Sequence, residues 1–510
     1  MEIELKLLVR PQDTATLREL PLLQQYAAGP ARELQMSDTY FDTARQQLRQ
    51  AGAGLRVRRV GDEFIQTLKA GGDASAGLHR RYEWESRVPT AEPDLAALRA
   101  MVGRTAPWSK LLRAPSIESR LAPIFQSQVT RTLWDLRLPD GDRVEFALDV
   151  GKLECGDEAV PISEIELELK SGNAIHLFDL ALALHERIPM QIGTMSKAER
   201  GYSLCRPHPR MATPNLPVQL AKRSNVEQAF KTIAANCLAQ IQANAAGVAH
   251  DYDGESLHQM RVGLRRLRSA LDVFKDVVAL PGDIGQDVDW LAHELGNARD
   301  WDVLAGSTLP LLSKQIPAAG PLLDVTHAAL DSGRDAHITA AAAVSSPRYT
   351  KLMLSLGRWM FGNGWREPGN GKGKSRLDAP VAAFAGKVLR RAHKRMKKRG
   401  RALSAAAPET LHRARIAAKK ARYATEFFAS LYRGKQVRPY VKALGALQDE
   451  LGKVNDATVG DRLLGQMENA RHDLAGAIAP VRAALAERVA GSGGKARKLW
   501  KRYSAVKLPR

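Results

Sequence analysis

The chain has 510 residues, 44% of them hydrophobic and 26% charged, which is more than one hydrophobic core usually organises, so we expect at least two domains. No apolar run is long enough to cross a membrane, and the charged start Met1–Lys6 is not expected to be a secretory signal. The net charge of +21 is uneven, because residues 1–205 sum to −3 and residues 206–510 to +24. The second part therefore calls for a polyanionic partner, which could be nucleic acid, an anionic membrane surface or polyphosphate.

In the first 205 residues, short stretches alternate apolar and polar residues between turn residues, which predicts β-strands. Asp140-Gly141 and Cys155-Gly156-Asp157 predict hairpin turns, and Ala174–Ile188 predicts a helix capped by Asn173. Strands joined by short turns favour an antiparallel sheet or closed barrel. The predicted strands are Glu2–Val9, Gly54–Val60, Glu63–Ala70, His79–Val88, Arg143–Gly151 and Val160–Lys170.

The three cysteines, Cys155, Cys205 and Cys237, lie far apart and form no CxxC pair. We therefore expect neither a disulfide framework nor a zinc cluster. This usage of cysteine is typical of a reducing, cytoplasmic compartment.

Beyond residue 205 the composition changes. Residues 206–222 contain four prolines, which predicts a semi-extended linker. From Val226 onward, Ala, Leu, Lys and Arg recur at helical spacing, which predicts an all-α domain over 223–490. The glycine-rich Gly362–Asp378 and the basic tail over 491–510 are both interpreted as mobile loops.

The helical half repeats itself. Leu257-His258-Gln259-Met260-Arg261 recurs 154 residues later as Leu411-His412-Arg413-Ala414-Arg415. Leu295-Gly296-x-x-x-Asp300 recurs 156 residues later as Leu451-Gly452-x-x-x-Asp456, and Phe230 and Phe384 are again 154 apart. Three matches at nearly one offset predict two tandem helical-bundle repeats, over about 223–345 and 379–490.

The charged residues of several predicted strands fall on one face, as in Glu2-Ile3-Glu4-Leu5-Lys6. For any single strand, such a face is more often exposed to water. If the sheet closes with these faces inward, however, the lumen offers acidic oxygens for Mg²⁺ or Mn²⁺ and basic groups for phosphate. Periodicity alone does not determine which face is inside. The same parity holds in Leu55–Arg58, Arg81–Glu85 and Glu164–Lys170.

These motifs resemble the CYTH domain, the triphosphate tunnel metalloenzyme family, whose opening ExExK signature corresponds to Glu2–Lys6. ExExK is a weak string alone, but the ordered set over about 200 residues is specific. The resemblance implies an eight-stranded antiparallel barrel whose tunnel binds a triphosphate and a divalent metal ion. The match continues through Thr39–Asp42, Leu55–Arg58, Thr67–Lys69, Arg81–Glu85, Arg131, Asp149, Glu164–Glu168 and Lys197–Tyr202.

The resemblance also implies roles for the charged residues. The implied metal ligands are Glu2, Glu4, Glu166 and Glu168, with Glu83, Glu85, Asp149 and Glu164 supporting a second metal ion or the attacking water. The implied phosphate-binding cations are Lys6, Arg56, Arg58, Lys69, Arg131, Lys197 and Arg200, and Arg81 and Lys170 share the parity of this group. Glu2, Glu4, Lys6, Glu83, Glu85 and Asp149 form the implied catalytic set. Arg200 and Lys170 also have non-functional interpretations. Arg200 could form a surface ion pair with Glu199, and Lys170 could lie in solvent at the end of a strand.

In the helical half, His258, Arg261, Arg265 and Arg268 share one face of a helix, and His412, Arg415, Lys419 and Arg422 repeat the spacing. A basic stripe is ordinarily a solvated face. Residues 380–435, however, hold 16 Lys or Arg and only two acids, Glu409 and Glu426, so few pairs within the helices are possible. Cations at this density repel one another unless a polyanion neutralises them.

This half resembles the CHAD domain over about Ser224–Arg488, on the strength of its two His-x-x-Arg helices. The resemblance implies two related helical bundles and binding of inorganic polyphosphate through the eight basic-face residues. The fold expected for the whole chain is thus α+β, a barrel followed by an all-α domain.

The leading hypothesis is an inorganic triphosphatase that cleaves tripolyphosphate and also binds long-chain polyphosphate. One alternative keeps the tunnel fold but changes the substrate to a nucleoside triphosphate, as in class IV adenylate cyclases, or to thiamine triphosphate. Another is a polyphosphate-binding or granule-targeting protein with weak hydrolysis. Nucleic acid is a weaker partner, because no recognition motif appears and aromatic residues hardly interleave with the basic ones.

Overall fold

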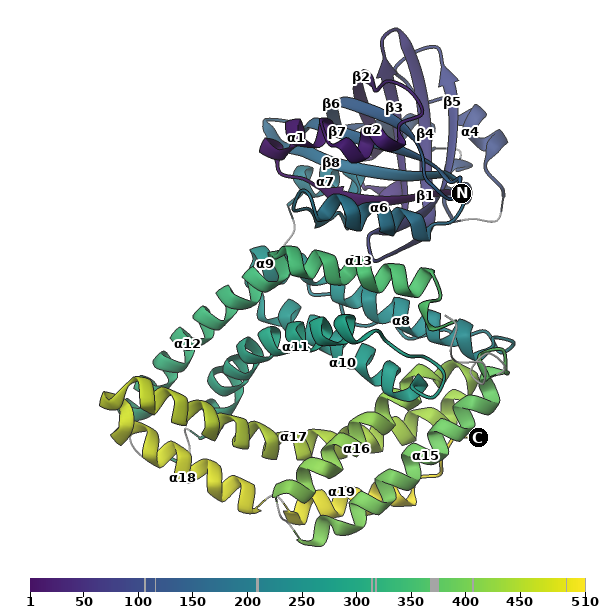
Figure 1. Cartoon of the computed structure of the whole chain (residues 1–510). Helices are drawn as coiled ribbons and strands as arrows, with labels where there is room; N and C mark the ends of the chain where they lie inside the picture. Colours follow the sequence, from purple (N-terminus) through teal and green to yellow (C-terminus); the bar gives the residue numbers. More distant parts are fainter. Residues whose placement is uncertain are drawn as a thin grey trace. The chain divides into compact units, whose positions relative to one another are not determined.

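The computed structural model describes residues 1–104, 107–114, 116–207, 211–312, 315–316, 319–366, 376–405, 408–491 and 493–509. The chain divides into two compact units, residues 1–210 with 350–362, and residues 211–349 with 363–510. The first unit is mainly strand and the second is helical (Figure 1). Within the described residues, no helix is long and apolar enough to span a membrane.

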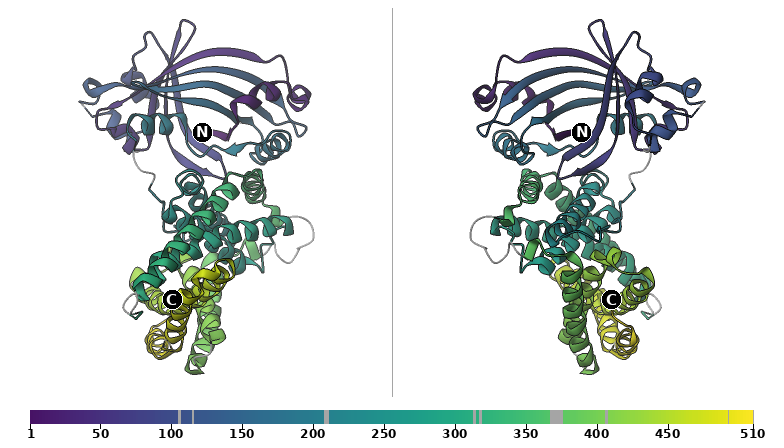
Figure 2. Two further views of the ribbon diagram at one scale, coloured as in Figure 1. Left: turned by 90° about the vertical axis from the view of Figure 1, so that its left-hand side faces the viewer. Right: turned by 90° about the vertical axis from the view of Figure 1, so that its right-hand side faces the viewer.

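Eight antiparallel strands of the first unit close into a barrel (Figure 2), as the sequence predicts. They follow the order β5-β4-β3-β2-β6-β7-β8-β1, and pairing of β1 with β5 closes the ring. A ninth short strand, β9 (Gln191–Ile192), pairs with β1. The strands are β1 (Glu2–Leu8), β2 (Arg32–Thr43), β3 (Ala53–Val60), β4 (Glu63–Ser75), β5 (Leu78–Val88), β6 (Leu121–Arg137), β7 (Arg143–Cys155) and β8 (Glu158–Ser171).

The six predicted strands and both hairpin turns are confirmed, whereas β2 and β6 were not predicted as strands. In β2, the polar side chains of Asp38, Asp42 and Thr43 are buried along with Tyr40 and Phe41, so burial does not follow an alternation of apolar and polar residues. β6 has Pro123 near its start, which weakens a strand prediction. The helix predicted after Asn173 is confirmed as α6 (Ile175–His185).

Helices cover the outer, apolar faces of the barrel strands. Leu5 and Leu167 pack against Leu177 of α6 in one core cluster, which also includes α1 (Thr14–Arg18) and α2 (Pro21–Tyr26). A second cluster joins Leu55 of β3 to Leu98, in α4 (Leu95–Met101), and includes α5 (Pro107–Leu112). Because the apolar faces point outward under these helices, the charged faces point into the barrel. Two further helices, α3 (Gln47–Gln50) and α7 (Lys197–Cys205), complete the described helices before residue 207.

The second unit consists of helices whose order repeats. α8, α10 and α11 correspond to α15, α16 and α17, which confirms the predicted duplication. Residues 350–362, which include most of α13, group with the barrel unit. The helices are α8 (Val226–Ala243), α9 (Ala245–His250), α10 (Gly254–Phe274), α11 (Gly282–Val303), α12 (Ala319–Ser345), α13 (Pro347–Phe361), α15 (Val381–Arg401), α16 (Pro408–Phe427), α17 (Gly434–Ala470), α18 (Ala475–Gly491) and α19 (Gly493–Ala505).

The two repeats meet through equivalent residues. The Val226 amide donates to the Ala379 carbonyl and the Val381 amide donates to the Ser224 carbonyl, each at 3.0 Å. Phe274 lies at the centre of an aromatic cluster, with its ring centroid 5.2 Å from Phe230, 5.0 Å from Phe384 and 6.1 Å from Phe428. The repeats are therefore joined by a shared apolar core.

Three expectations drawn from composition concern the segments outside the two domains. The basic tail forms helix α19, with Ala496 and Tyr503 buried, because its apolar residues recur at helical spacing. The proline-rich linker is tied to the helical unit, since the Leu220 amide donates to Ser430 Oγ at 2.9 Å. Most of the predicted loop Gly362–Asp378, residues 367–375, lies outside the described residues.

The expectation that no disulfide forms is also wrong. Cys155 at the end of β7 and Cys205 at the end of α7 are joined by a disulfide across 50 residues of sequence, with 5.4 Å between their Cα atoms. The third cysteine, Cys237, is free and buried. Sequence spacing gave no sign of this pairing, because only the fold brings the two elements together.

Replacing Phe274 with Ala should cost about 3–5 kcal/mol of unfolding free energy in the helical unit, because it empties the centre of the aromatic cluster. Urea unfolding followed by circular dichroism at the helical band measures this loss. Leu323→Ala on α12, where the side chain is 54% exposed, is the control and should change stability by less than about 0.5 kcal/mol. Equal stability of the two variants would mean that the cluster does not hold the repeats together.

Candidate active site and central basic cluster

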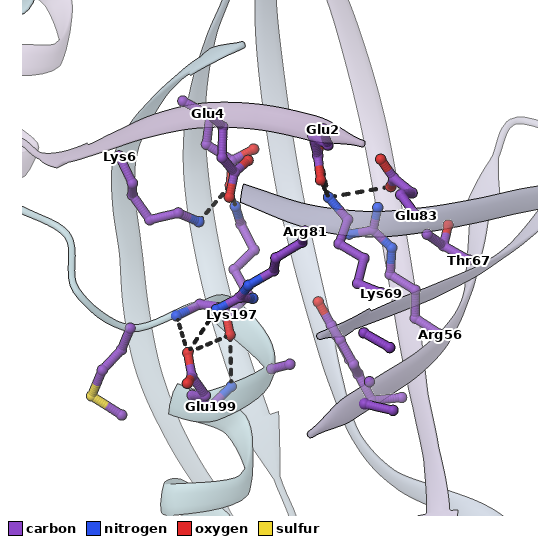
Figure 3. Close-up of a pocket in the computed structure, with 18 of the residues that line it drawn as sticks. Glu2, Glu4, Lys6, Arg56, Thr67, Lys69, Arg81, Glu83, Lys197 and Glu199 are labelled. Carbon is purple, nitrogen blue, oxygen red and sulfur yellow. Dashed lines mark hydrogen bonds and ion pairs between the residues drawn. The ribbon is translucent and has the colours of Figure 1, made fainter. Parts of the chain in front are cut away.

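The barrel encloses a cavity of about 660 Å³. Side chains from all around the ring point into it, including Glu2 and Glu4 from β1 and Lys69 from β4 (Figure 3). Fourteen of the predicted residues line it, namely Glu2, Glu4, Lys6, Arg56, Arg58, Lys69, Arg81, Glu83, Glu85, Arg131, Glu166, Glu168, Lys170 and Lys197. The other three, Asp149, Glu164 and Arg200, lie outside its lining.

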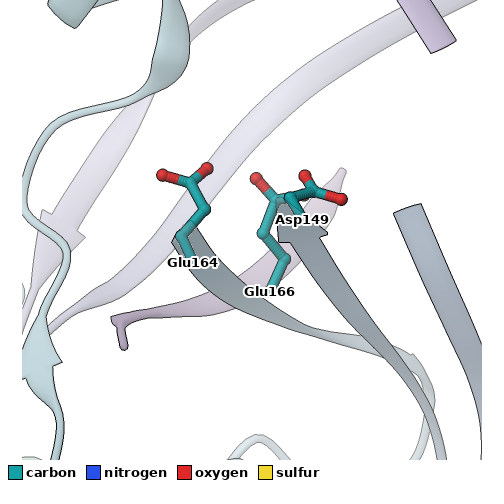
Figure 4. A group of neighbouring side chains, drawn as sticks. All are labelled: Asp149, Glu164 and Glu166. Atoms are coloured by element: carbon teal, nitrogen blue, oxygen red, sulfur yellow. The ribbon is translucent and has the colours of Figure 1, made fainter. Parts of the chain in front are cut away.

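Asp149, Glu164 and Glu166 converge at one side of the cavity (Figure 4), with ligand oxygens that all lie within 4.8 Å of one another. Lys6 Nζ lies 2.6 Å from Glu166 and 3.2 Å from Glu164. Lys197 Nζ lies 2.6 Å from Asp149 and 3.0 Å from Glu166.

A third cation completes this group. Arg131 donates two hydrogen bonds of 2.7 Å to the Asp149 carboxylate and one of 2.6 Å to Glu166. Burial alone would raise the pKa of Glu166, but Lys197, Lys6 and Arg131 outweigh it and hold this pKa well below its usual value. Lys6, Lys197 and Arg131 thus compensate the charge of the three carboxylates, and Arg200 adds a fourth cation beside Glu164.

Glu4 differs from this neutralised group. Its side chain is largely buried at the cavity wall, and in the described part of the chain it has no hydrogen bond or ion pair. Directly opposite it on β8 is Glu168, which is paired with Lys170 at 2.7 Å and whose pKa is raised by burial. Of these two facing carboxylates, Glu168 has a cation within ion-pair distance and Glu4 has none in the described structure. Together they form a donor set that fits a hard divalent metal ion.

The remaining predicted carboxylates are held by neighbours. Glu2 accepts two hydrogen bonds of 2.8 Å from Lys69, whose Nζ also lies 3.2 Å from Glu83. Glu85 accepts a 2.8 Å bond from Thr67. The four implied metal ligands and Glu164, the candidate for a second metal ion, therefore divide into two sets. Glu164 and Glu166 belong to the neutralised group, and Glu2, Glu4 and Glu168 lie around the open part of the cavity.

Outside the lining, Arg200 Nη1 lies 3.1 Å from Glu164, so its partner is a buried acid and not the neighbouring Glu199. Glu199 instead caps the start of α7 and lies 3.5 Å from Arg81. The helix begins at Lys197, so its first turn places Lys197 among the buried carboxylates.

Asp38 is a site residue that the motifs missed. It is buried, and its carboxylate accepts bonds of 2.7 and 3.0 Å from Arg58, with Arg56 at 3.4 Å. It lies two residues before the cavity-lining Tyr40, so strand parity was the signal that could have found it. Other cavity-lining residues that the motifs missed are Arg49, Glu145, Ser196 and Ser203.

In the helical unit, Arg261 and Arg265 of α10 lie near Arg415 and Lys419 of α16, and we call these four residues the central basic cluster. Burial, then Arg415, Arg265 and Arg261, lower the pKa of Lys419 to about 7. Burial lowers the pKa of Arg261 to about 10, and Arg265 contributes to the same shift against the attraction of Asp300. These directions indicate positive charge that its surroundings do not fully compensate.

Several donors of this cluster lack partners. Within the described residues, the buried atoms Arg261 Nη1, Arg265 Nε and Arg415 Nε form no hydrogen bond. The repeated motif supplies Asp300, whose nearest oxygen is 3.9 Å from Arg261, and Asn455, which accepts a 2.7 Å bond from Arg415. Unpaired guanidinium donors from both repeats are suited to bind an anion between them.

The other four predicted basic-face residues do not belong to the central basic cluster, and each has its own environment. Arg268 is half exposed and pairs with Asp289 at 2.9 Å, and Arg422 pairs with Glu426 at 2.7 Å. His258 is half-buried near Arg261 and Arg265, and burial lowers its pKa. His412 lines a separate pocket with Asn455.

Taken together, the barrel with its charged cavity and the duplicated helical unit define a two-domain protein. Residues 1–202 match the CYTH domain and residues 232–465 match the CHAD domain, so the chain belongs to the proteins that carry both. The resemblance inferred from the motifs is thereby confirmed.

Individual relatives agree with this assignment. The helical part is similar to the crystal structure of the CHAD domain from the plant Ricinus communis, with 38% identity, a TM-score of 0.54, and coverage of 59% of this chain and 99% of that one. The barrel is 37% identical over 204 residues, 40% of this chain, to an inorganic triphosphatase of Haemophilus influenzae. The match spans 54% of the length of that curated relative.

Asp38→Asn should destabilise the barrel by about 1–3 kcal/mol at neutral pH, because it leaves two arginines without their counter-charge. Burial opposes ionisation, but Arg58 and Arg56 outweigh it and depress the pKa of Asp38, so its stabilising contribution is present above the unfolded-state pKa. The difference between wild type and variant should shrink as the pH falls below about 4. Urea unfolding of both proteins across this range measures it.

The matched control is Asp135→Asn, which removes a carboxylate from the exposed ion pair with Arg32. Its effect should stay below about 1 kcal/mol. If Asp135→Asn lowered the unfolding free energy as much as Asp38→Asn, burial of the Asp38 ion pairs would not make them more stabilising than an exposed pair.

Proposed function

We propose that the barrel is a metal-dependent inorganic triphosphatase, which hydrolyses tripolyphosphate to pyrophosphate and phosphate with Mg²⁺ or Mn²⁺. The observation that carries this proposal is the cavity lined by both cations and carboxylates, in which Glu4 forms no hydrogen bond or ion pair among the described residues. The relationship to an inorganic triphosphatase of Haemophilus influenzae supports it. Tripolyphosphate is small and highly charged, and a cavity of about 660 Å³ has room for it.

Within this proposal, Glu4 and Glu168, with Glu2 beside them, would hold the metal ion. When bound, a divalent ion neutralises phosphate oxygens and polarises the P–O bond that is broken. Arg56, Arg58 and Lys69 bind and orient the phosphate chain, and Asp38 fixes the two arginines. Glu83 and Glu85 are assigned to the attacking water, and Asp149 with Glu164 to the positioning of Lys197.

An inorganic substrate is favoured over a nucleoside or thiamine triphosphate. The aromatic residues among the described cavity lining are Tyr40 and Tyr202. Tyr40 is stacked on Phe125, and the Tyr202 hydroxyl donates to Asp42 at 2.9 Å. Neither ring is free to stack on a base or a thiazolium, which is how aromatic residues commonly bind such groups.

For the helical domain, we propose binding of long-chain inorganic polyphosphate at the central basic cluster, with residues 1–205 and 223–490 acting as the two functional domains. The unpaired guanidinium donors of both repeats support this role. Association with polyphosphate granules would follow from such binding. If the barrel turned over tripolyphosphate only weakly while the cluster bound polyphosphate tightly, granule targeting would become the main function.

Glu4→Gln should lower turnover on the order of 100-fold, since the amide keeps the shape but not the charge needed for a metal ion. Phosphate release from tripolyphosphate, ATP and thiamine triphosphate with Mg²⁺ or Mn²⁺, together with cyclic AMP formation, tests both role and substrate. Glu92→Gln, at an exposed site, is the control and should leave activity unchanged. Near wild-type turnover of Glu4→Gln at saturating metal would exclude the ligand role.

Polyphosphate binding by the full-length protein should tighten as the pH falls from 8 to 6, because Lys419, with a pKa of about 7, gains its proton in this range. Bound anion raises this pKa, and each rise of about one in the pKa corresponds to roughly tenfold tighter binding at the low-pH end. Titration at constant salt measures it. Lys419→Gln should flatten the profile, whereas Lys420→Gln, which removes the pair with Asp272, should not. A steep profile in Lys419→Gln would assign the effect to another group.

A further inference from the structure

A second cationic surface lies outside the central basic cluster. Helix α15 carries nine Lys or Arg residues, α19 carries five, and neither helix contains an acidic residue. Lys394, Arg395 and Lys398 of α15 and Lys498 and Lys501 of α19 are all exposed, and we call these five residues the outer basic surface. The match to the CHAD domain ends at residue 465, before α19 begins.

The buried sides of α15 and α19 fix both helices in one cluster. His393 Nδ1 lies 2.8 Å from the Tyr503 hydroxyl and 3.0 Å from that of Tyr440, and the two hydroxyls are 2.7 Å apart. Trp500 packs against Gly400, where a Cβ atom would overlap the indole ring. Because the apolar and aromatic side chains face this core, the cations of both helices are left on the outside.

These exposed cations are not compensated. In the part of the chain that the structure describes, none of the five residues of the outer basic surface has an acidic partner within ion-pair distance. Beside them, Arg391 pairs with Asp276 at 3.2 Å and Lys495 pairs with Glu450 at 3.3 Å. Repulsion among the unpaired charges is relieved by a polyanion, whose condensed counterions are released on binding.

The residues of the outer basic surface indicate which kind of polyanion it can bind. The exposed large hydrophobic residues of the described chain all lie outside α15 and α19. The aromatic residue Trp500 of α19 is turned into the core. None of the described residues on this surface can therefore insert into a membrane or stack on bases, so recognition depends on phosphate charge alone. A flexible chain of phosphates without bases or lipid tails meets this requirement.

We infer that the outer basic surface is a second binding site for inorganic polyphosphate, which holds a stretch of a long chain beyond the stretch bound at the central basic cluster. The inference rests on the proposed polyphosphate binding. Two sites that engage one chain raise its affinity through effective concentration, without any additional contact at either site. Short chains, which cannot reach both sites, gain nothing from the outer one.

The test compares a short chain of roughly ten phosphates with a long chain of roughly several hundred, by equilibrium binding to full-length protein over a range of salt. The variant combines Lys394→Gln, Lys398→Gln, Lys498→Gln and Lys501→Gln. It should bind the long chain at least about tenfold more weakly and the short chain normally. The slope of its long-chain affinity against salt, on logarithmic axes, should fall by roughly 0.7 for each phosphate that the variant no longer neutralises.

The matched control replaces four exposed lysines elsewhere, Lys222, Lys351, Lys435 and Lys442, with Gln, which removes the same charge. Unchanged long-chain binding in the test variant, or an equal loss in the control, would overturn the inference. Loss of short-chain binding in the test variant would also overturn it, because the surface would then belong to the central site. Thermal unfolding verifies that both variants are folded.

Two other outcomes separate this inference from the function proposed above. In the first outcome, the wild-type protein binds long chains through the outer basic surface and does not bind short chains. In that case polyphosphate binding at the central basic cluster is rejected, and binding at the outer basic surface is supported. If duplex DNA of equal charge binds the wild type as tightly as long polyphosphate and loses affinity equally in the variant, the surface is a nucleic-acid site. That result would overturn the inference.

Discussion

Buried charge must be compensated, and this constraint shapes both parts of the protein. In the barrel, the strands turn their apolar faces outward under α4 and α6, which leaves alternating acids and cations to meet inside the ring. There they neutralise one another, and the pKa values of Lys6 and Arg131 rise despite burial because carboxylates surround them. The exception is Glu4, whose carboxylate lines the cavity and attracts Lys69 and Lys6 but forms no direct hydrogen bond or ion pair in the described structure.

In the helical unit, by contrast, buried positive charges are not fully compensated by nearby acids. Arg261, Arg415 and Lys419 have lowered pKa values, first because burial disfavours their charged forms and then because cations of both repeats converge there. In the proposed function, the barrel cavity would hold a metal ion together with a compact anion, and the helical cluster would hold an anion alone. This difference in local compensation, more than net charge, separates a site suited to phosphoryl transfer from one suited to binding.

Duplication explains how the helical cluster forms. The paired backbone bonds at Val226 and Val381 and the aromatic cluster around Phe274 hold the repeats in register, so that equivalent basic helices approach each other. A single repeat would expose its basic face to water, where counterions screen it. The second copy brings like charges together and buries part of them, as the lowered pKa of Lys419 reflects.

Much of this protein is determined by the sequence itself, because strand parity, the 154-residue repeat and the ordered CYTH motifs are local patterns. They predicted the barrel, the duplicated bundle and fourteen residues of the cavity wall. The alternation along each strand does not show which face of the sheet lies inside the barrel. The pairing of β1 with β5 closes the barrel and places the charged face inside. Tertiary structure also decided the partners of each charge, the role of Asp38, the disulfide of Cys155 with Cys205, and the packing of α19. These depend on distances between segments far apart in the chain, and no local pattern of residues encodes such distances.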